Sequence, residues 1–311
     1  MKACRTIFAL VLATLLCAVP AHAQLSGSNI AGDFGLKSGS QAPPGVYLGY
    51  FLYNYGSSKL VGQDGRELAF DSGDIDAWAH AGIISVVTGK KILGATYGAT
   101  IIPSVMDLSI EAPRVNLTKG TGFGSGDLYV IPVNLGWTTK HADVVSWYGF
   151  FAPTGRYNAG ATDNRGLGMW SHEVVVGSTF YLKEDKSLHV SALTAYEMHT
   201  KKKDTDIKVG QLLTIEGGIG ATTKKAMNIG MAYYAQWKLT NDSGLGVPPL
   251  VEGRLGKNHN YGLGPEGSMV LPLSKDLSKL AILNFRYLFD LGSQLDTKGQ
   301  TLVFNVTFKL K

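Results

Sequence analysis

The sequence predicts an all-β protein, a transmembrane antiparallel β-barrel of about twelve strands preceded by an irregular N-terminal segment. Three observations predict this fold class. The chain opens with an export signal, and no later apolar run is long enough for a membrane-spanning helix. Its strands show apolar faces, and their connections are alternately short and long, as in barrels whose turns and loops lie on opposite sides of a bacterial outer membrane.

Residues 1–23 have the features of a secretory signal peptide. Positive charge at Lys2 and Arg5 precedes an apolar run that is too short to span a membrane, and Ala21-His22-Ala23 is a small-residue cleavage site. We therefore expect the mature chain to begin at Gln24. Export of this kind also makes a nucleic-acid partner implausible, and no basic stripe is present.

Cysteine and charge usage narrow the class further. Both cysteines, Cys4 and Cys17, lie in the signal, so neither disulfides nor thiol chemistry is expected in the mature chain. Charged residues make up 17% of the sequence, below the roughly 25% of soluble domains. Removal of Lys2 and Arg5 with the signal lowers the formal net charge from +5 to +3.

Residues 24–45 are rich in Gly, Ser and Ala and end in Pro43-Pro44-Gly45. This composition predicts an irregular segment rather than a strand. Two interpretations remain open for it, a plug inside the barrel lumen or a disordered periplasmic leader.

Residues 46–311 form the predicted barrel. The twelve predicted strands are Val46–Tyr55, Ile75–Val87, Ile92–Ile110, Asp127–Thr138, Val144–Ala152, Trp170–Leu182, Leu188–His199, Val209–Ala221, Met227–Leu239, Asn260–Leu273, Lys279–Leu291 and Gln300–Leu310. Alternation is clearest in the sixth, ninth, eleventh and twelfth. In the last strand Leu302, Phe304 and Val306 share a lipid face, while Asn305 and Thr307 face the lumen.

The connections are sorted by length. Short polar ones are predicted at Thr88–Lys91, Thr139–Asp143, Lys183–Ser187, Thr222–Ala226 and Ser274–Ser278. Between them lie mostly longer ones at Gly56–Asp74, Glu111–Gly126, Pro153–Met169, Thr200–Lys208, Thr240–His259 and Gly292–Gly299. The strict alternation predicts periplasmic turns at one end and extracellular loops at the other.

Tryptophans gather toward the predicted strand ends. Trp78, Trp170 and Trp237 lie near outer ends, and Trp137 and Trp147 near inner ends. They are interpreted either as two interfacial girdles or as ordinary strand aromatics. The final residues after Phe308 depart from the usual terminal aromatic, so the signal for the barrel-assembly machinery is imperfect.

Several stretches, read in order, carry a family resemblance. They are Pro43-Pro44-Gly45, GSGDLYVIPVNLGW from Gly124, PTGRYNAG from Pro153, KDTDIKVGQLLTIEGGIG from Lys203, IGMAYYAQWKLTND from Ile229 and NYGLGPEGSMVLP from Asn260. Together they resemble the outer-membrane family named for the meta-pathway of phenol degradation, and in outline the long-chain fatty-acid transporters. The resemblance implies a transport barrel for aromatic or other hydrophobic compounds.

Six charged residues lie inside predicted strands: Glu173, Glu197, Glu216, Lys238, Arg286 and Asp290. A charge on the lipid face costs about 2–4 kcal/mol at mid-depth, so these side chains should face the lumen. They would either line a pathway or form a paired network that stiffens the barrel. At the loop mouth, Arg156 of the PTGRY stretch would face lipopolysaccharide phosphates or the lumen, or serve only the turn.

No catalytic residue, metal ligand or cofactor site is predicted. The glycine-rich stretch 122–126 lacks the Lys-Ser/Thr of a phosphate loop, and Asp204 and Asp206 lack further calcium ligands. Ser171 and His172 are adjacent in a strand and point to opposite faces, which argues against a hydrolase.

The sequence thus predicts passive uptake of small hydrophobic or aromatic compounds. A width of about twelve strands lies between filled small barrels and open porins, which suits a narrow or plugged passage. Expected partners are outer-membrane lipid, lipopolysaccharide, the barrel-assembly machinery and the small hydrophobic substrate. The alternatives are a structural or adhesive barrel with a closed lumen and, less favoured, a barrel enzyme acting on lipids.

Overall fold

The computed structural model describes residues 26–68, 74–112, 117–161, 163–223, 226–244, 257–276 and 278–310. The predicted signal peptide lies outside these ranges. No helix in the described part of the chain is long and apolar enough to cross a membrane.

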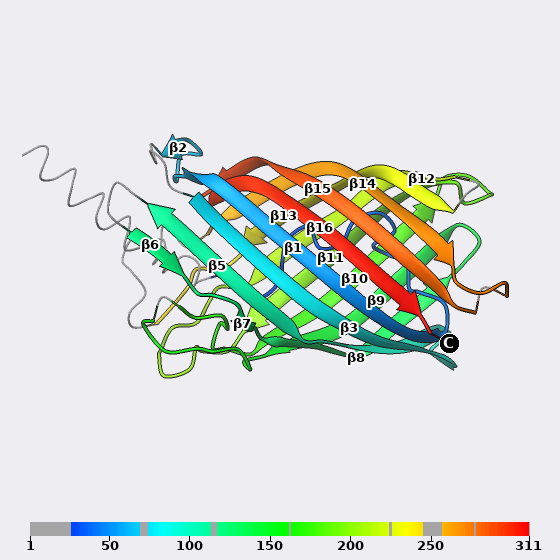
Figure 1. Cartoon of the computed structure of the whole chain (residues 1–311), viewed down its shortest axis with the longest axis horizontal. Coiled ribbons are helices and arrows are strands. Elements are labelled where there is room, and N and C mark those ends of the chain that lie inside the picture. The colour runs from blue at the N-terminus through cyan, green and yellow to red at the C-terminus, as the bar shows by residue number, and fades with distance from the viewer. Residues whose placement is uncertain are drawn as a thin grey trace, which may run out of the picture.

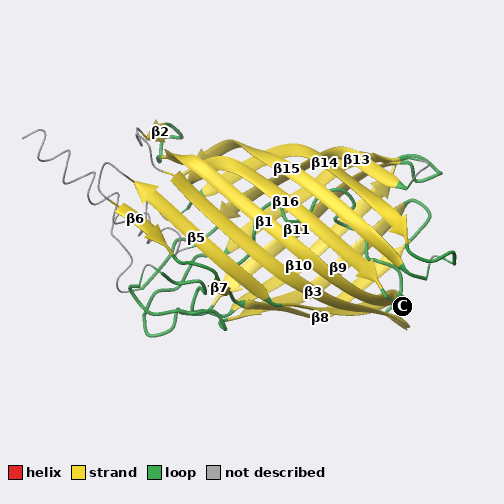
Figure 2. Cartoon of the chain, in the orientation of Figure 1, coloured by secondary structure: helices red, strands yellow, loops and turns green. Residues whose placement is uncertain are grey.

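Sixteen antiparallel strands form one sheet (Figures 1 and 2). They are β1 (Gly45–Val61), β2 (Glu67–Leu68), β3 (Asp74–Ile92), β4 (Ala95–Ile102), β5 (Ser104–Ala112), β6 (Leu117–Gly120), β7 (Gly124–Ser125), β8 (Leu128–Thr138), β9 (Ala142–Ala152), β10 (Ser171–Tyr181), β11 (Leu188–His199), β12 (Leu212–Thr222), β13 (Met227–Lys238), β14 (His259–Pro272), β15 (Leu280–Gln294) and β16 (Thr297–Lys309).

The sheet closes on itself because β1 pairs with β3 on one side and β16 on the other. The short strands β2, β6 and β7 lie outside this ring. β4 and β5 both pair with β3 and are one barrel strand interrupted at Pro103, which cannot donate a backbone hydrogen bond. Twelve strands therefore surround the lumen, and the predicted fold class is confirmed. Closure leaves the first and last strands without an open edge.

Two of the predicted connections are in the wrong place. The first turn is Leu93-Gly94, both with positive φ (52° and 80°), rather than Thr88–Lys91. With this two-residue turn, β3 and β4 stay paired as far as Ile92 and Ala95. The last outer connection is the two-residue turn at 295–296, with Leu295 at φ 54°, whereas a longer connection is predicted over Gly292–Gly299. The alternation of short and long connections is thus not strict.

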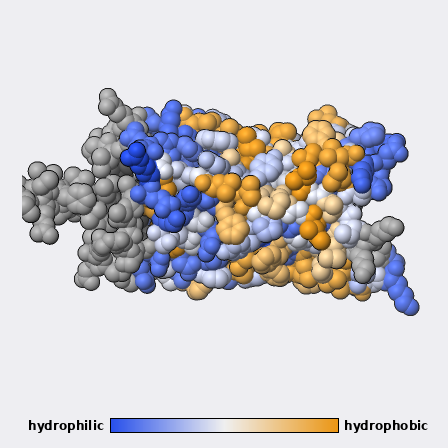
Figure 3. Space-filling view, turned by 90° about the horizontal axis from the view of Figure 1, so that it is seen from above, coloured by the Kyte–Doolittle hydropathy of each residue, from blue (hydrophilic) through white to orange (hydrophobic). Residues whose placement is uncertain are grey.

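The outward face is apolar where the sequence predicts it. On β10 Val174, Val176 and Phe180 point away from the lumen and are 44%, 53% and 54% exposed in the isolated chain. On β16 Thr301 and Val303 are buried on the inner side. Figure 3 shows apolar side chains gathered over the strands and hydrophilic ones at both ends. This surface suits a hydrocarbon layer between two aqueous phases.

Residues 26–44 run along the interior of the barrel (Figure 1). Ser28 contacts the outer end of β11 through Glu197, and Ser40 contacts the inner start of β9 through Asp143. The segment therefore follows the lumen from the loop-bearing end to the turn-bearing end, where it continues into β1. Gly39 lies so close to β10 that a Cβ there would meet the Ser178 backbone at 2.1 Å.

Candidate functional site

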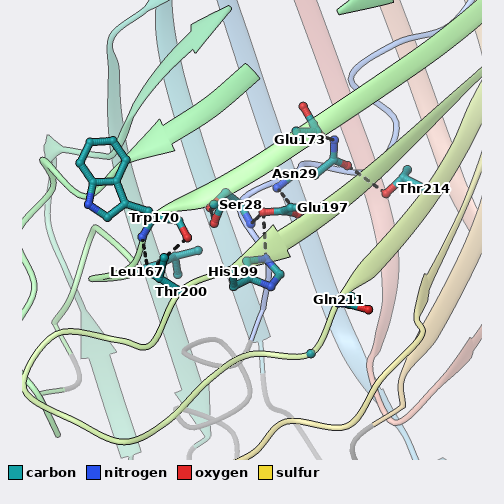
Figure 4. Close-up of polar contacts among 12 residues, drawn as sticks. Ser28, Asn29, Leu167, Trp170, Glu173, Glu197, His199, Thr200, Gln211 and Thr214 are labelled. Atoms are coloured by element: carbon teal, nitrogen blue, oxygen red, sulfur yellow. Dashed lines mark hydrogen bonds and ion pairs between the residues drawn. The ribbon is translucent and has the colours of Figure 1, made fainter. Parts of the chain in front are cut away.

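One side of the lumen holds the N-terminal segment through carboxylates. Glu197 accepts hydrogen bonds from the Ser28 and Asn29 amides at 2.7 and 3.2 Å, and His199 Nε2 lies 3.0 Å from the same carboxylate. Asn29 also donates from its side chain to Glu173 at 2.7 Å. Figure 4 shows these groups meeting between neighbouring strands of the wall.

The same pattern continues deeper in the barrel. Glu216 accepts from the Gly32 and Phe34 amides at 3.0 and 3.1 Å. Glu266 accepts from the Leu36 amide at 2.9 Å and pairs with Arg286 at 2.8 Å. Arg286 in turn donates to the Gly32 carbonyl at 2.6 Å. The irregular backbone, which has no ladder partner of its own here, thus has its polar groups satisfied by charged side chains.

All six in-strand charges are buried and on the inner side of the wall: Glu173, Glu197, Glu216, Lys238, Arg286 and Asp290. Lys238 pairs with Asp242 at 2.9 Å beneath the outer loops, apart from the other five. Asp290 accepts from the Tyr55 and Tyr234 hydroxyls and the Gly299 amide. Sequence reasoning missed Glu266, although its inward position in β14 follows from the same strand alternation.

The other side of the lumen contains an apolar cavity of about 380 Å³. Its wall includes Phe51, Ala79, Ala81, Ile83, Ile102, Met106, Tyr129, Ile131, Trp147, Phe151, Val175 and Leu193. The N-terminal segment contributes Ile30 and Phe34. Tyr129 stacks on Phe151 with ring centroids 4.1 Å apart, and Phe34 meets Trp147 at 5.4 Å. Several aromatic rings therefore stand on the wall of the cavity.

Trp147 corrects the girdle interpretation. It is 6% exposed and donates from Nε1 to the Tyr129 hydroxyl at 3.1 Å inside the lumen, so it does not belong to an interfacial girdle. Trp170 and Trp237 are exposed on the outside, as expected of girdle residues. The parity of Trp147 with buried Val145 on β9 could have indicated its inward direction.

The outer loops pack against one another at the outer end of the barrel. Met169, Val209 and Leu212 form a buried cluster between them. Lys202 donates to the Leu167 carbonyl at 2.8 Å. Burial lowers the pKa of Lys202 to about 8, against the attraction of the nearby Asp127 carboxylate. The loops thus form a folded roof with its own small core rather than loose connections.

Arg156 lies in this roof and pairs with Asp163 at 2.7 Å, with about half of its side chain exposed. Ser171 and His172 are divided by the wall, as their adjacency predicts. The Ser171 hydroxyl meets Ser28 inside, while His172 contacts the Tyr148 hydroxyl on the other face. No group of three or more potential metal-ligating side chains occurs among the described residues.

A closed barrel with an apolar outer surface and a plug-like inner segment defines an outer-membrane β-barrel protein, located in the bacterial outer membrane. The family model described as "Putative MetA-pathway of phenol degradation" matches residues 53–305. This match spans well over half of the chain, so the protein belongs to that family. The predicted resemblance is confirmed.

The fold is similar to that of the COG4313 outer membrane channel from Pseudomonas putida F1. That comparison has a TM-score of 0.72 and 12% identity, and covers 90% of this chain and 99% of the other. A Pseudomonas aeruginosa FadL homologue has a TM-score of 0.40 with 10% identity, covering 85% and 90% of the two chains. The CymD monoaromatic hydrocarbon channel has a TM-score of 0.43 with 8% identity, covering 93% and 96%. No curated protein sequence matches the chain.

Proposed function

We propose that the protein is a channel for passive inward passage of small hydrophobic or aromatic compounds, with residues 26–44 as a plug in its lumen. The observation that carries the proposal is the mainly apolar cavity of about 380 Å³, with aromatic rings on its wall, inside a membrane barrel. An apolar cavity of roughly 150 Å³ holds benzene in another protein, so this one has room for a ring with substituents.

The comparisons support the same class. The COG4313 outer membrane channel from Pseudomonas putida F1 has a similar fold, and the family description refers to phenol degradation. Lipopolysaccharide slows hydrophobic solutes, so a protein route would raise their flux most when the solute is scarce. We further propose that lipopolysaccharide contacts the exposed roof at Arg156 and that the barrel-assembly machinery inserts the chain.

Gene deletion tests the transport proposal. Cells lacking the gene should grow more slowly on a low concentration of an aromatic carbon source and normally at a high concentration. Complementation with the intact gene should restore growth. Uptake of labelled aromatic compounds that is the same with and without the protein, over a range of compounds, would contradict the proposal.

Removal of Gln24–Gly45 tests the plug separately. The truncated barrel should conduct small ions better in planar bilayers, because the segment fills the polar side of the lumen. The alternative of a structural or adhesive barrel with a closed lumen predicts no solute uptake by the intact protein. The alternative of a lipid-active enzyme is weakened, because Ser171 and His172 lie on opposite faces of the barrel wall and cannot act together.

A further inference from the structure

Among the polar residues on the wall of the apolar cavity, Glu173, Tyr129 and Asn29 form one hydrogen-bonded patch. Tyr129 donates to one oxygen of Glu173 at 2.5 Å, and Asn29 Nδ2 donates to the other at 2.7 Å. Trp147 Nε1 donates to the Tyr129 hydroxyl at 3.1 Å. The patch is therefore ordered on every side before any solute enters.

The packing of Tyr129 against β9 fixes the position of its hydroxyl in this patch. Tyr129 lies across β9 at Gly149, where a Cβ would meet the Tyr129 hydroxyl oxygen at 2.6 Å. Stacking on Phe151 fixes the ring in that position. The hydroxyl is thereby directed at Glu173 on the next strand, β10, rather than toward the loops.

The hydrogen-bonding capacity of the patch is only partly used. A carboxylate has about four acceptor positions, and two of those on Glu173 are taken by Tyr129 and Asn29. The Asn29 side-chain oxygen accepts from Thr214 at 3.1 Å, which fixes the amide in this position. At Glu173 the wall thus offers an incoming solute a hydrogen-bond acceptor close to apolar and aromatic side chains.

The charges around the cavity favour the same kind of solute. Arg165, Asp33 and Asp127 also line the cavity. The Arg165 guanidinium donates to the carbonyls of Thr121 and Gly122, and Asp127 accepts from the Gly155 and Leu167 amides. Arg286 is paired with Glu266 on the other side of the N-terminal segment. A solute carboxylate beside Glu173 would place two acceptor groups together with no cation between them, which is costly in an apolar site.

We infer that Glu173, positioned by Tyr129 and Asn29, is a specificity-determining residue that selects neutral aromatic compounds carrying one hydrogen-bond donor over bare hydrocarbons and over arylcarboxylates. The inference rests on the proposed transport function and names the substrate class of the same cavity. Aromatic stacking would hold the ring, and the Glu173 carboxyl would accept from the donor.

The test compares uptake of three solutes that share one ring and one carbon substituent: radiolabelled toluene, benzyl alcohol and benzoate at neutral pH. Protein-dependent uptake is the rate in expressing cells minus that in cells lacking the gene. The intact protein should favour benzyl alcohol, with benzoate lowest. In Glu173→Gln, which keeps the size but adds a donor, the ratio of benzyl alcohol to benzoate should fall roughly tenfold.

Asp290→Asn is the matched control, because Asp290 is a buried lumenal carboxylate that does not line the cavity. It should leave the ratio unchanged. Tyr129→Phe repeats the test without changing charge and should also reduce the preference for benzyl alcohol, which covers a failure of the Glu173 variant to fold. Heat-modifiable migration on gels verifies folding of each variant.

The outcomes separate this inference from the proposed function. If no solute shows protein-dependent uptake, the transport function itself fails. If all three are taken up through the protein but neither Glu173→Gln nor Tyr129→Phe changes their ratios, transport stands and the assignment of Glu173 is wrong. A ratio that changes equally in Asp290→Asn would also overturn the assignment, because the effect would then come from lumenal charge in general.

Discussion

The two sides of the lumen are made from different side chains, although they share one barrel. From β10 to β15 the inner wall carries Glu197, Glu216 and Glu266, which accept hydrogen bonds from five backbone amides of the N-terminal segment between Ser28 and Leu36. From β1 to β9 the inner wall carries small apolar and aromatic side chains around a cavity, which Val175 on β10 and Leu193 on β11 also line. The polar side binds a fixed piece of the chain, and the apolar side is left open for something else. The difference indicates that anchoring and passage are separate tasks.

Removing the Arg286–Glu266 ion pair on the polar side should lower the free energy of unfolding more than any other change considered. Arg286→Leu leaves Glu266 buried without its partner and removes the donor to the Gly32 carbonyl. Loss of one member of a buried ion pair costs about 3–5 kcal/mol. Urea titration of the folded barrel in liposomes should show a decrease of that size. A loss below about 1 kcal/mol would mean that the pair contributes little to the fold.

A smaller loss is expected where the segment enters the lumen. Glu197→Gln keeps the shape but replaces one accepting oxygen by an amide donor facing the Ser28 and Asn29 amides. Hydrogen bonds to a charged group contribute about 1.5–3 kcal/mol, and a decrease in that range should appear in the same titration. Glu67→Gln, in an exposed ion pair with Lys59, is the control and should change stability by less than about 1 kcal/mol.

The smallest effect should appear in the roof and should depend on pH. The pKa of Lys202 is lowered by burial to about 8, below its ordinary value, so the unfolded roof binds the proton more tightly than the folded one. Stability of the roof should therefore rise as pH increases from about 8 toward 10.5. Hydrogen-exchange protection of the 200–211 loop, corrected for intrinsic rates, should increase over this range. Lys202→Met should abolish the dependence; the same rise in that variant would assign it to another group.

The contrast between the two sides also explains what the sequence could predict. The four strands with the clearest alternation are β10, β13, β15 and β16, and three of these belong to the polar side. In these strands the inner face is polar and the lipid face is apolar, so the sequence alternates with a period of two. Charged residues inside these strands could be assigned to the lumen because lipid exposure is costly.

The apolar side gave no such signal. In the range Ile75–Val87 the inward Ala79, Ala81 and Ile83 are apolar, and the outward face carries the apolar Ile84 and Val86. A strand that is apolar on both faces looks the same whether its inner face packs or lines a cavity. Phe34 could not be placed either, because the N-terminal segment has no periodicity. The turns at Leu93 and Leu295 were missed because a leucine has positive φ at the first position of each, where Gly or Asn is the usual signal.

In the proposed function, solutes pass on the apolar side of the lumen. Ala81→Leu adds bulk to the cavity wall, and Ala235→Leu makes the same change on the outward face of β13. Protein-dependent uptake of labelled benzyl alcohol at low concentration should fall severalfold in Ala81→Leu and stay at the wild-type rate in Ala235→Leu, with both barrels folded. Equal uptake by Ala81→Leu and the unaltered protein would show that the cavity is not the route.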